Sequence, residues 1–379
     1  MDILVLNWRD IKNPEAGGAE VHLHEIFRRI AMLHNEVVFV SSKFKNCKDY
    51  EVVDGLKVIR IGNKFFFNFS AFWYYMTKLR KEHFDIVIDG VSKIPLYTPL
   101  YIKKPLVAII HHIHGKTLFK ELPFLMGAYV YFSEKLIPFF YKHIPFITVS
   151  ESTKKELIRM GIPKKNIKVI YNAFDHELHK LGKKSEMPLV AYVGRIKKYK
   201  QLDLLIKAFR LVKKRLPKAE LIVAGKGNCH KELKGLADKL GMNLELHGEI
   251  TDEEKVRILQ SSWVFVTPSM KEGWGITVIE ANACGTPAIA FNVPGLRDSI
   301  KNERTGLLVE YDNIKSLSEA IIDILENEHL RKKLSKNAFD YSKQFTWNES
   351  TLQVLRLLEG MMVNVENTNI MLGINKIKN

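Results

Sequence analysis

Two carboxylates stand eight positions apart in the second half of the chain, where their setting could support chemistry. Glu272 precedes a Gly-Trp-Gly loop, and Glu280 falls in the helix that this loop opens. The neighbours of Glu280 are mostly apolar, and burying a carboxylate among them is costly unless it is hydrogen-bonded. The backbone N–H groups after Gly275 would form an anion site at the same helix start. The pattern favours a binding or catalytic role over a solvated helix face.

Two cations lie five positions apart in an earlier loop. Arg195 and Lys200 follow Gly194 at the end of an expected strand. Arginine offers a planar fork and lysine a mobile point charge, which together suit a diphosphate. In a chain with 58 Lys and Arg residues, a solvated loop is the alternative. The position beyond a strand's carboxyl end favours the diphosphate, since ligands of open α/β sheets bind there.

A third loop carries the paired glycines Gly17 and Gly18 immediately before an expected helix. Exposed N–H groups and the helix dipole favour an anion at such a place. A tight loop that needs glycine for its geometry explains the pair equally well.

The elements that position these loops alternate along the whole chain. Short β-branched runs are separated by stretches of helical period, which predicts parallel sheets with helices on both faces. We expect strands at 3–7, 37–41, 58–61, 86–89, 106–110, 146–149, 168–171, 189–193, 221–224, 244–247, 263–266, 288–291 and 306–309. We expect helices at 20–32, 71–81, 151–160, 202–214, 231–240, 252–260, 276–284, 314–325, 328–343 and 347–361.

The alternation pauses over residues 176–188, which are charged and aperiodic and include Gly182 and Pro188. This stretch is typical of a linker. We therefore predict an α/β fold of two doubly wound Rossmann-like domains, 1–180 and 186–345, that face each other across a cleft. We expect the helix 347–361 to complete the first domain and the Asn-rich segment after Met362 to fray.

The 379-residue chain carries 58 Lys and Arg against 42 Asp and Glu, a formal net charge of +16. This balance suggests an anionic partner: nucleic acid, a membrane surface or phosphorylated small molecules. Three widely spaced cysteines provide neither a disulfide framework nor a zinc site. The start lacks the pattern of a signal peptide, and no apolar run reaches the length of a membrane span. We expect a cytoplasmic protein.

Taken in order, these motifs resemble the retaining GT-B glycosyltransferases of the large family four. The similarity runs over nearly the whole chain: Gly-Gly-x-Glu at 17–20, a histidine after an inner strand, Gly-Arg-x(4)-Lys at 194–200, and Glu-x(7)-Glu at 272–280. Two details depart from the family pattern. Asn-Ala-Phe-Asp stands at 172–175 in place of Asn-Gly-Val-Asp, and Trp274 replaces the usual phenylalanine. Neither departure removes a charged group.

The resemblance implies that the chain transfers a sugar from a nucleotide-sugar donor, with Arg195 and Lys200 holding the donor diphosphate. It places Glu272 beside the donor sugar and Glu280 on the ribose hydroxyls, with the loop at 17–18 closing on the phosphates. The donor-binding set is then Gly17, Gly18, Gly194, Arg195, Lys200, Glu272, Gly273, Trp274, Gly275, Ile276, Thr277 and Glu280.

The resemblance also implies a histidine that contacts the donor sugar, after the strand that ends at Ile110. The alignment gives His111, with His112 in the place of the family's usual aspartate. His114 lies close enough in sequence to be the alternative, and a structural role is open for one or two of the three. The expected catalytic residues are thus Glu272, Arg195, Lys200 and His111.

The mechanism implied is transfer with retention of anomeric configuration. Retention through two carboxylates would need a nucleophile about 5 Å from the acid, and this class lacks an obvious one. We therefore expect front-face attack, with the departing diphosphate stabilised by the two cations and by helix N-termini. These cations would replace a metal's electrostatic role, so no metal and no further cofactor are expected.

The acceptor is suggested only by aromatic residues. Residues 65–75 hold eight aromatics, and 91–150 hold eleven with seven lysines and two acidic residues. Rings and lysines together could contact an anionic bilayer, which favours a lipid-linked acceptor and a peripheral position at the inner face of the cell membrane. We expect at least half of these rings to be core.

Two other classes of function compete. A basic single-strand nucleic-acid binder would explain the charge and the aromatics, but not two carboxylates beside a glycine loop, so we expect no nucleic-acid partner. A sugar-nucleotide epimerase or a phosphorylase would keep the fold and change the reaction. A phosphorylase of the related type would need a pyridoxal-phosphate lysine, for which the sequence offers no convincing position.

Overall fold

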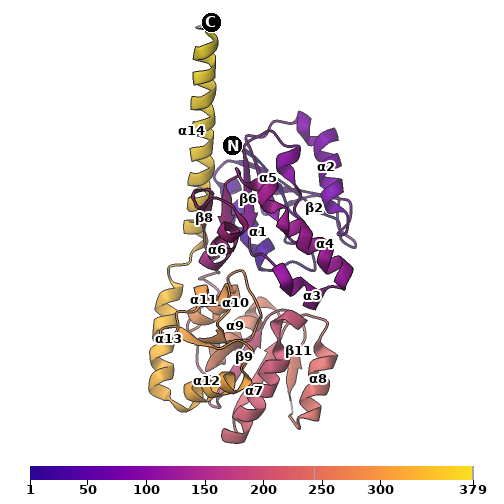
Figure 1. The fold of residues 1–379 in the computed structure, drawn as a ribbon. Coiled ribbons are helices and arrows are strands. Elements are labelled where there is room, and N and C mark those ends of the chain that lie inside the picture. Colours follow the sequence, from indigo (N-terminus) through magenta and orange to yellow (C-terminus); the bar gives the residue numbers. More distant parts are fainter. Residues whose placement is uncertain (243, 378–379) are drawn as a thin grey trace.

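The chain forms two open sheets, one in each half (Figure 1). The computed structural model describes residues 1–242 and 244–377, and the side chains of all of these except 116, 120 and 364–377. Helices cover the faces of both sheets, and the two halves are stacked with the last helix, α14, running alongside the first half. The predicted fold class, two doubly wound α/β domains, is confirmed.

The first sheet has eight strands in the order β3-β4-β2-β1-β5-β6-β7-β8, and only β3 is antiparallel. Its strands are β1 (Asp2–Leu6), β2 (Glu36–Ser42), β3 (Tyr50–Val53), β4 (Leu56–Ile61), β5 (Ile86–Val91), β6 (Leu106–Ile110), β7 (Phe146–Thr148) and β8 (Ile167–Val169). The strand order reverses between β1 and β5, which is where a doubly wound sheet opens a crevice at its carboxyl edge.

The second sheet has six parallel strands in the order β11-β10-β9-β12-β13-β14. They are β9 (Leu189–Val193), β10 (Glu220–Ala224), β11 (Glu245–His247), β12 (Val264–Thr267), β13 (Ala288–Phe291) and β14 (Gly306–Val309). Counted within the domain this order is 3-2-1-4-5-6, the arrangement of nucleotide-binding doubly wound folds. The crevice falls between β9 and β12.

Helices follow the strands in both halves. The α-helices are α1 (Gly18–Met32), α2 (Phe67–Thr77), α3 (Leu118–Glu121), α4 (Phe124–Lys135), α5 (Ile137–Tyr141), α6 (Glu151–Met160), α7 (Leu202–Arg215), α8 (His230–Lys239), α9 (Asp252–Ser261), α10 (Ile276–Ala283), α11 (Leu296–Ser299), α12 (Ile314–Glu326), α13 (Glu328–Ser342) and α14 (Trp347–Ile377). Short 3-10 turns are η1 (Leu79–Lys81), η2 (Thr98–Leu100), η3 (Gly115–Thr117), η4 (Lys164–Asn166) and η5 (Lys198–Lys200).

The predicted strands are confirmed to within a few residues. One strand, β3, was not predicted from the sequence. This strand pairs with β4 across the tight turn at Asp54 and Gly55, both at positive φ. The segment after Met362, which we expected to fray, continues α14 to Ile377.

The start of α14 packs against the first half. Val354 and Leu358 are fully buried, and Ser350 Oγ donates to the Tyr171 carbonyl over 2.8 Å. The Trp347 ring lies 6.1 Å from the ring of His22 on α1. The chain thus crosses back from the second sheet to cover α1, close to one of the histidines described below.

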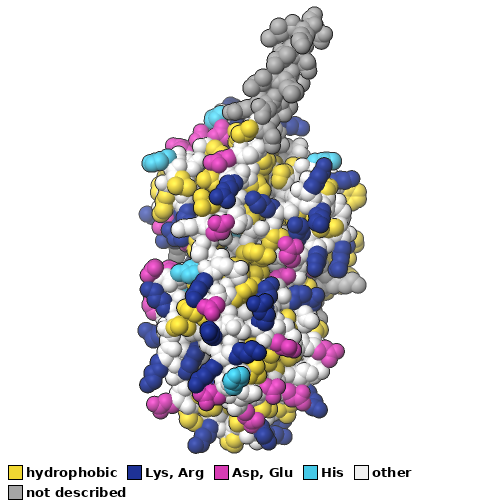
Figure 2. Space-filling view, turned by 90° about the vertical axis from the view of Figure 1, so that its left-hand side faces the viewer, with side chains coloured by type: hydrophobic (Ala, Val, Ile, Leu, Met, Phe, Trp, Pro, Cys, Tyr) yellow, Lys and Arg dark blue, Asp and Glu magenta, His cyan; other side chains and the backbone are white. Residues whose placement is uncertain are grey.

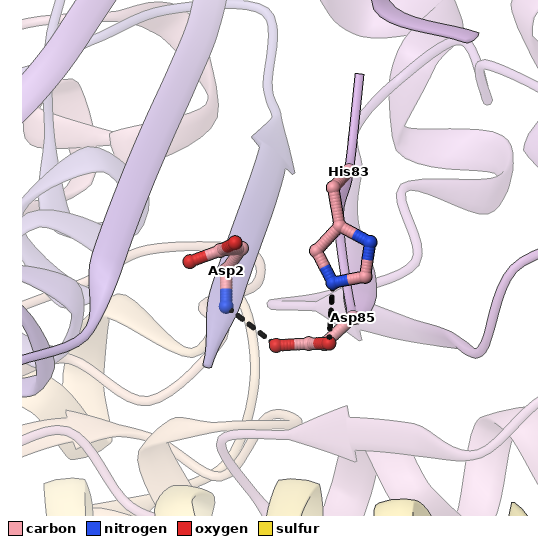
Figure 3. A group of neighbouring side chains, drawn as sticks. All are labelled: Asp2, His83 and Asp85. Carbon is pink, nitrogen blue, oxygen red and sulfur yellow. Dashed lines mark hydrogen bonds and ion pairs between the residues drawn. The ribbon is translucent and has the colours of Figure 1, made fainter. Parts of the chain in front are cut away.

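Three polar residues, Asp2, His83 and Asp85, lie together at the amino-terminal edge of the first sheet (Figure 3). The carboxylate of Asp85 accepts the Asp2 backbone N–H over 2.7 Å and lies 3.1 Å from His83 Nε2. These contacts tie the start of β1 to the start of β5. The oxygen and nitrogen atoms of the three side chains that could bind a metal ion lie within 4.8 Å of one another.

Within the described chain, no helix is both long and apolar enough to span a bilayer.

Candidate active site

The loops at the carboxyl edges of the two sheets meet face to face. A β-carbon built on Gly17 would lie 2.5 Å from Arg195 Nη2, and one built on Gly18 would lie 3.1 Å from Ile276 Cδ1. The loop before α1 therefore rests on the loops after β9 and after β12. The residues that the sequence predicts for the donor site come together here from both halves.

The Gly17 N–H is already used at the start of α1. Glu20 Oε2 accepts it over 2.8 Å, and the Glu20 side chain is buried. This bond closes a capping arrangement that fixes how the loop enters the helix. Arg195 and Arg9 place positive charge near Glu20, while burial raises its pKa. The glycine pair is thus required both for close approach to Arg195 and for the helix start.

Lys200 and Glu272 form an ion pair in the cleft. Their side chains are only 13% and 16% exposed, so water screens the pair weakly. Burial alone would lower the pKa of Lys200, but the Glu272 charge outweighs it and the pKa is raised. Arg195, from the same loop, is exposed to solvent. The site therefore presents one cation already neutralised by a carboxylate and a second that is accessible.

The loop at 273–275 is built for close backbone approach. A β-carbon on Gly273 would lie 2.6 Å from the carbonyl oxygen of His111, and Gly275 has a φ of +86°. Trp274 between them is only 2% exposed and packs on Tyr171, with ring centroids 4.6 Å apart. The indole, predicted among the donor-binding residues, is a core side chain that supports the loop. Thr277 is half-buried in the first turn of α10.

Glu280 is buried on α10 and is paired, as its apolar surroundings require. Lys255 Nζ from α9 donates to Glu280 Oε1 over 3.0 Å, and His179 Nε2 lies 3.7 Å from the same oxygen. Burial opposes the charge of Lys255, yet the Glu280 carboxylate outweighs it and raises the Lys255 pKa. Neither partner was expected from the sequence, since both lie far from Glu280 along the chain.

His111 lies just after the end of β6, where it contacts His22 of the first half and the Gly273 loop of the second. Its Nε2 lies 3.0 Å from His22 Nδ1, and its carbonyl oxygen accepts a bond from Thr153 Oγ1 over 3.3 Å. Burial lowers the pKa of His111 to about 4 and holds the pKa of His22 well below its ordinary value. Both rings are neutral at pH 7, so His111 can offer hydrogen bonds to a sugar but no positive charge.

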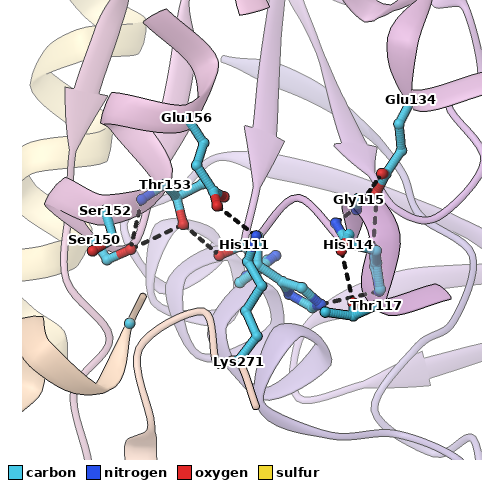
Figure 4. A network of polar contacts seen from close by, with 12 residues as sticks. His111, His114, Gly115, Thr117, Glu134, Ser150, Ser152, Thr153, Glu156 and Lys271 are labelled. Atoms are coloured by element: carbon cyan, nitrogen blue, oxygen red, sulfur yellow. Dashed lines mark hydrogen bonds and ion pairs between the residues drawn. The ribbon is translucent and has the colours of Figure 1, made fainter. Parts of the chain in front are cut away.

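The next two histidines have a different environment (Figure 4). His112 Nε2 lies 3.0 Å from His114 Nε2, and His114 Nδ1 lies 3.0 Å from Glu134 Oε1. The carboxylate of Glu134 also accepts the backbone N–H groups of His114 and Gly115, each over 2.8 Å. Glu134 was not predicted as a site residue, because it lies in the aromatic helix α4 outside any recognised motif.

Polar contacts also bind the two halves directly. Lys271 Nζ, one residue before Glu272, donates to Glu156 Oε1 on α6 over 2.5 Å (Figure 4). Asp298 Oδ2 accepts the backbone N–H of Ser152 over 3.2 Å. These contacts hold the 271–275 loop and α11 against α6, whose Thr153 in turn donates to the His111 carbonyl. Lys271 was not among the predicted site residues, because a lysine in so basic a chain carries no distinguishing signal.

Two doubly wound sheets with cations, carboxylates and glycine loops between them define a GT-B fold. Residues 16–178 match the sequence profile of the family described as Glycosyltransferase Family 4, and residues 163–341 match the profile described as Glycosyl transferases group 1. The chain belongs to these group 1, family 4 glycosyltransferases.

Relatives and solved structures agree with this assignment. An uncharacterised glycosyltransferase of Methanocaldococcus jannaschii is 25% identical over 92% of this chain and 96% of its own length. Sucrose-phosphate synthase of Thermosynechococcus elongatus superposes with a TM-score of 0.80 at 20% identity, over 96% of this chain and 99% of its own. HepE of Anabaena, in complex with UDP and glucose, gives 0.76 at 20% identity, over 95% and 100%.

Proposed function

We propose that the protein transfers a sugar from a nucleotide-sugar donor to an acceptor hydroxyl with retention of configuration. The observation that carries the proposal is the meeting of Arg195 and the Lys200–Glu272 pair with the starts of α1 and α10. Two cations and two helix N-termini are well suited to a diphosphate. The HepE structure, which holds UDP and glucose, supports a nucleotide sugar as the donor.

Donor binding would rearrange the ion pairs of the site. A diphosphate that reaches Lys200 competes with Glu272 for the ammonium, which frees the carboxylate to face the donor sugar. Glu280, held by Lys255 in a buried position, would accept hydrogen bonds from ribose hydroxyls. His111, neutral and half-buried, would contact the sugar. Each of these four residues thus has a contact that its charge and burial permit.

The reaction we propose is a front-face substitution. The bond from the anomeric carbon to the diphosphate oxygen breaks as the acceptor oxygen bonds to that carbon on the same face. The acceptor's proton passes to the departing diphosphate. Arg195, Lys200 and the two helix starts stabilise the growing negative charge, which is the largest kind of catalytic contribution in such sites. No metal is needed in this scheme, because the cations supply the same electrostatic stabilisation.

The acceptor side suggests a lipid. Five of the eight rings in residues 65–75 are exposed: Phe65, Phe66, Phe69, Phe72 and Trp73. So are five of the eleven rings in residues 91–150: Phe119, Phe124, Tyr129, Phe132 and Phe139. The expectation that at least half of these rings are core is therefore wrong. They lie on α2, α3, α4 and α5 or just before α2, along one side of the first half (Figure 1).

Exposed rings of this number are unusual on a monomer and mark a surface that binds something apolar. Leu125, at 81% exposed, and Phe139, at 80%, have little protein contact. Exposed lysines accompany them, including Lys64 and Lys135. Aromatic and cationic side chains together suit the interface of an anionic bilayer. We propose a peripheral contact with the inner face of the cell membrane and a lipid-linked acceptor.

A nucleic-acid partner is not favoured. On the face drawn in Figure 2 the basic side chains are spread over both halves and mixed with acidic ones, without a continuous basic stripe. The two family matches likewise do not favour an epimerase, a phosphorylase or a nucleic-acid binder.

The reaction is tested by acceptor-dependent release of nucleoside diphosphate. UDP-, GDP-, ADP- and dTDP-sugars are first ranked by thermal shift, since a ligand of the native state raises its apparent stability. The best donor is then assayed with polyprenyl-diphosphate-linked sugars and phosphatidylinositol, with and without EDTA, and the product anomer is read by NMR. Inverted product, or activity abolished by EDTA and restored by a divalent cation, would overturn the mechanism proposed.

A further inference from the structure

The first half contains a hydrogen-bonded chain of three side chains, His112, His114 and Glu134, to which donor binding assigns no role. His114 and Glu134 are 11% and 4% exposed at their side chains. The chain links the end of β6 to α4 through two contacts of 3.0 Å. Buried polar networks of this kind fix one arrangement when every member is satisfied.

The contacts determine where the protons are. Burial raises the pKa of Glu134, but two backbone N–H groups donate to its oxygens and the charges of Lys93 and Lys271 lie nearby, and both favour the ionised form. Glu134 is therefore an ionised acceptor, and His114 carries its proton on Nδ1. Burial keeps both histidines neutral by lowering their pKa values well below the ordinary one. His114 Nε2 is then bare, His112 Nε2 donates to it, and His112 Nδ1 is left as a bare acceptor.

His112 lies close to the cleft, since a β-carbon on Gly273 would lie 2.6 Å from the carbonyl oxygen of the preceding residue, His111. His112 follows His111, and the Lys271 charge is among the groups that lower the His112 pKa. The α3 helix packs against η5, the turn that carries Lys200. Among the described residues none forms a hydrogen bond with His112 Nδ1. The atom is nevertheless not among the fully buried polar atoms that lack a partner. His112 is half-buried, so part of the residue is accessible to solvent.

We propose that His112 binds the acceptor substrate, with Nδ1 accepting a hydrogen bond from an acceptor hydroxyl. Glu134 and His114 are positioning residues that hold the ring and its tautomer. A bare imidazole nitrogen repels a phosphate oxygen and attracts a hydroxyl proton, so it suits the acceptor better than the donor diphosphate. The inference rests on the transferase reaction proposed above and adds an acceptor contact to it.

A purely structural role for the chain would be to tie the 112–115 loop to α4, as the two backbone bonds to Glu134 do. Both roles share one tautomer of His112, because the contacts to His114 and Glu134 set it. They differ in what His112 Nδ1 does: anchoring alone leaves it without a role, whereas acceptor binding requires it to respond to a hydroxyl. The tautomer is therefore a precondition, and the response of Nδ1 to a hydroxyl probe and the KM of the acceptor separate the two roles.

The first experiment is nitrogen NMR of the full chain with labelled histidine. We expect His112 to be protonated on Nε2 and His114 on Nδ1, with n-octyl glucoside as a hydroxyl probe shifting only the His112 Nδ1 resonance. In Glu134→Gln the two tautomers should mix. The matched control is Asp54→Asn, which breaks a different histidine–carboxylate pair, with His24 at 2.7 Å. His112 protonated on Nδ1, or no response to the probe, would overturn the inference.

The second experiment compares two substitutions of His112 in the transfer assay. Asparagine places its amide near the Nδ1 position, whereas glutamine reaches the Nε2 position, so His112→Asn should keep more acceptor affinity than His112→Gln. We expect His112→Gln to raise the KM of n-octyl glucoside about ten-fold, as for one lost hydrogen bond, with the KM of the donor unchanged. Equal KM values in both variants and wild type would contradict the acceptor contact.

The two proposals fail in different ways. If wild type releases no nucleoside diphosphate with any acceptor, the transferase mechanism fails, while the tautomer measurement still decides the state of His112. If turnover is normal and all His112 variants keep the KM of the acceptor, only the present inference fails. Nucleotide-induced thermal shifts should be the same in wild type and the His112 variants, which shows that the donor site is intact.

Discussion

The two walls of the cleft present opposite kinds of chemistry. The second half contributes charges, with Arg195, Lys200 and Glu272 on loops after β9 and β12. The first half contributes neutral groups, with His22 and His111 paired over 3.0 Å and both kept neutral by burial. A site for a charged diphosphate and for uncharged hydroxyls would need this division, because the charged wall favours the diphosphate and the neutral wall favours hydroxyls.

The division also explains why the two walls tolerate charge differently. On the donor wall the charged groups satisfy one another until a ligand arrives, as Lys200 and Glu272 do. On the other wall burial removes the histidine charge altogether, and Glu134 is held by backbone N–H groups. The predictions below test this contrast, from the largest expected effect to the smallest.

The donor wall should lose function when a cation is removed. We expect Lys200→Ala or Arg195→Ala to reduce turnover by about 10²–10³, as for loss of a group that stabilises transition-state charge. Release of nucleoside diphosphate measures the effect, and circular dichroism checks the fold. Lys198→Ala is the matched control, because Lys198 is exposed in the same loop. Near-wild-type turnover in either site variant would contradict the donor assignment.

The donor wall could be predicted from sequence because its residues lie in contiguous motifs. Gly194 to Lys200 and Glu272 to Glu280 each follow one strand, so neighbours in sequence are neighbours in space. The same argument explains why both sheets were predicted, since strand–helix alternation is a local signal. Which loops face one another across the cleft could be predicted only from the family resemblance.

The rest of the site is made of partners that lie far apart in sequence. His22 is 89 residues from His111, and Lys255 is 25 residues from Glu280. Neither His22 nor Lys255 belongs to a local sequence motif, and a histidine on an amphipathic helix is ordinarily a core residue. The burial of the rings on α2 and α4 was misjudged for a related reason. Aromatic residues indicate core only where another element covers them, and the sequence does not show which faces are covered.

The histidine wall should respond to acid. Folded pKa values below the unfolded value of about 6.5 mean that the unfolded state binds more protons, so stability falls as pH drops below that value. From pH 7 to 5 each such histidine should cost about 2 kcal/mol of unfolding free energy. Asp89, whose pKa burial raises to about 6, acts in the opposite direction.

Urea unfolding at pH 7 and pH 5 measures this loss. The comparison that isolates it is wild type against His22→Phe, which removes one buried histidine and leaves Asp89 in place. The variant should lose less stability between the two pH values, by the amount of one group. Equal losses would contradict the neutral, buried state of His22 that the structure shows.

The exposed rings extend the contrast beyond the cleft. We expect Phe124→Ser with Leu125→Ser to weaken binding to anionic vesicles at least about ten-fold, since two large apolar side chains no longer enter the interface. Flotation with vesicles of phosphatidylglycerol and phosphatidylcholine measures the effect. Leu211→Ser, an exposed apolar residue of α7 in the second half, is the control. No binding by wild type would remove the membrane proposal.

The contact that joins the two walls should have the smallest effect. Lys271 and Glu156 are 13% and 22% exposed at their side chains, so their pairing is partly screened. A double-mutant cycle with Lys271→Met and Glu156→Gln should give a coupling of about 0.5–1 kcal/mol, measured by urea unfolding. The same cycle on the exposed pair of Lys180 and Glu177, at 60% and 90%, should give less. Because Lys271 adjoins Glu272, loss of the pair should also loosen the carboxylate loop and raise the KM of the donor. A coupling of zero with an unchanged KM would mean that the two walls are held together by packing at Gly273 and Trp274 instead.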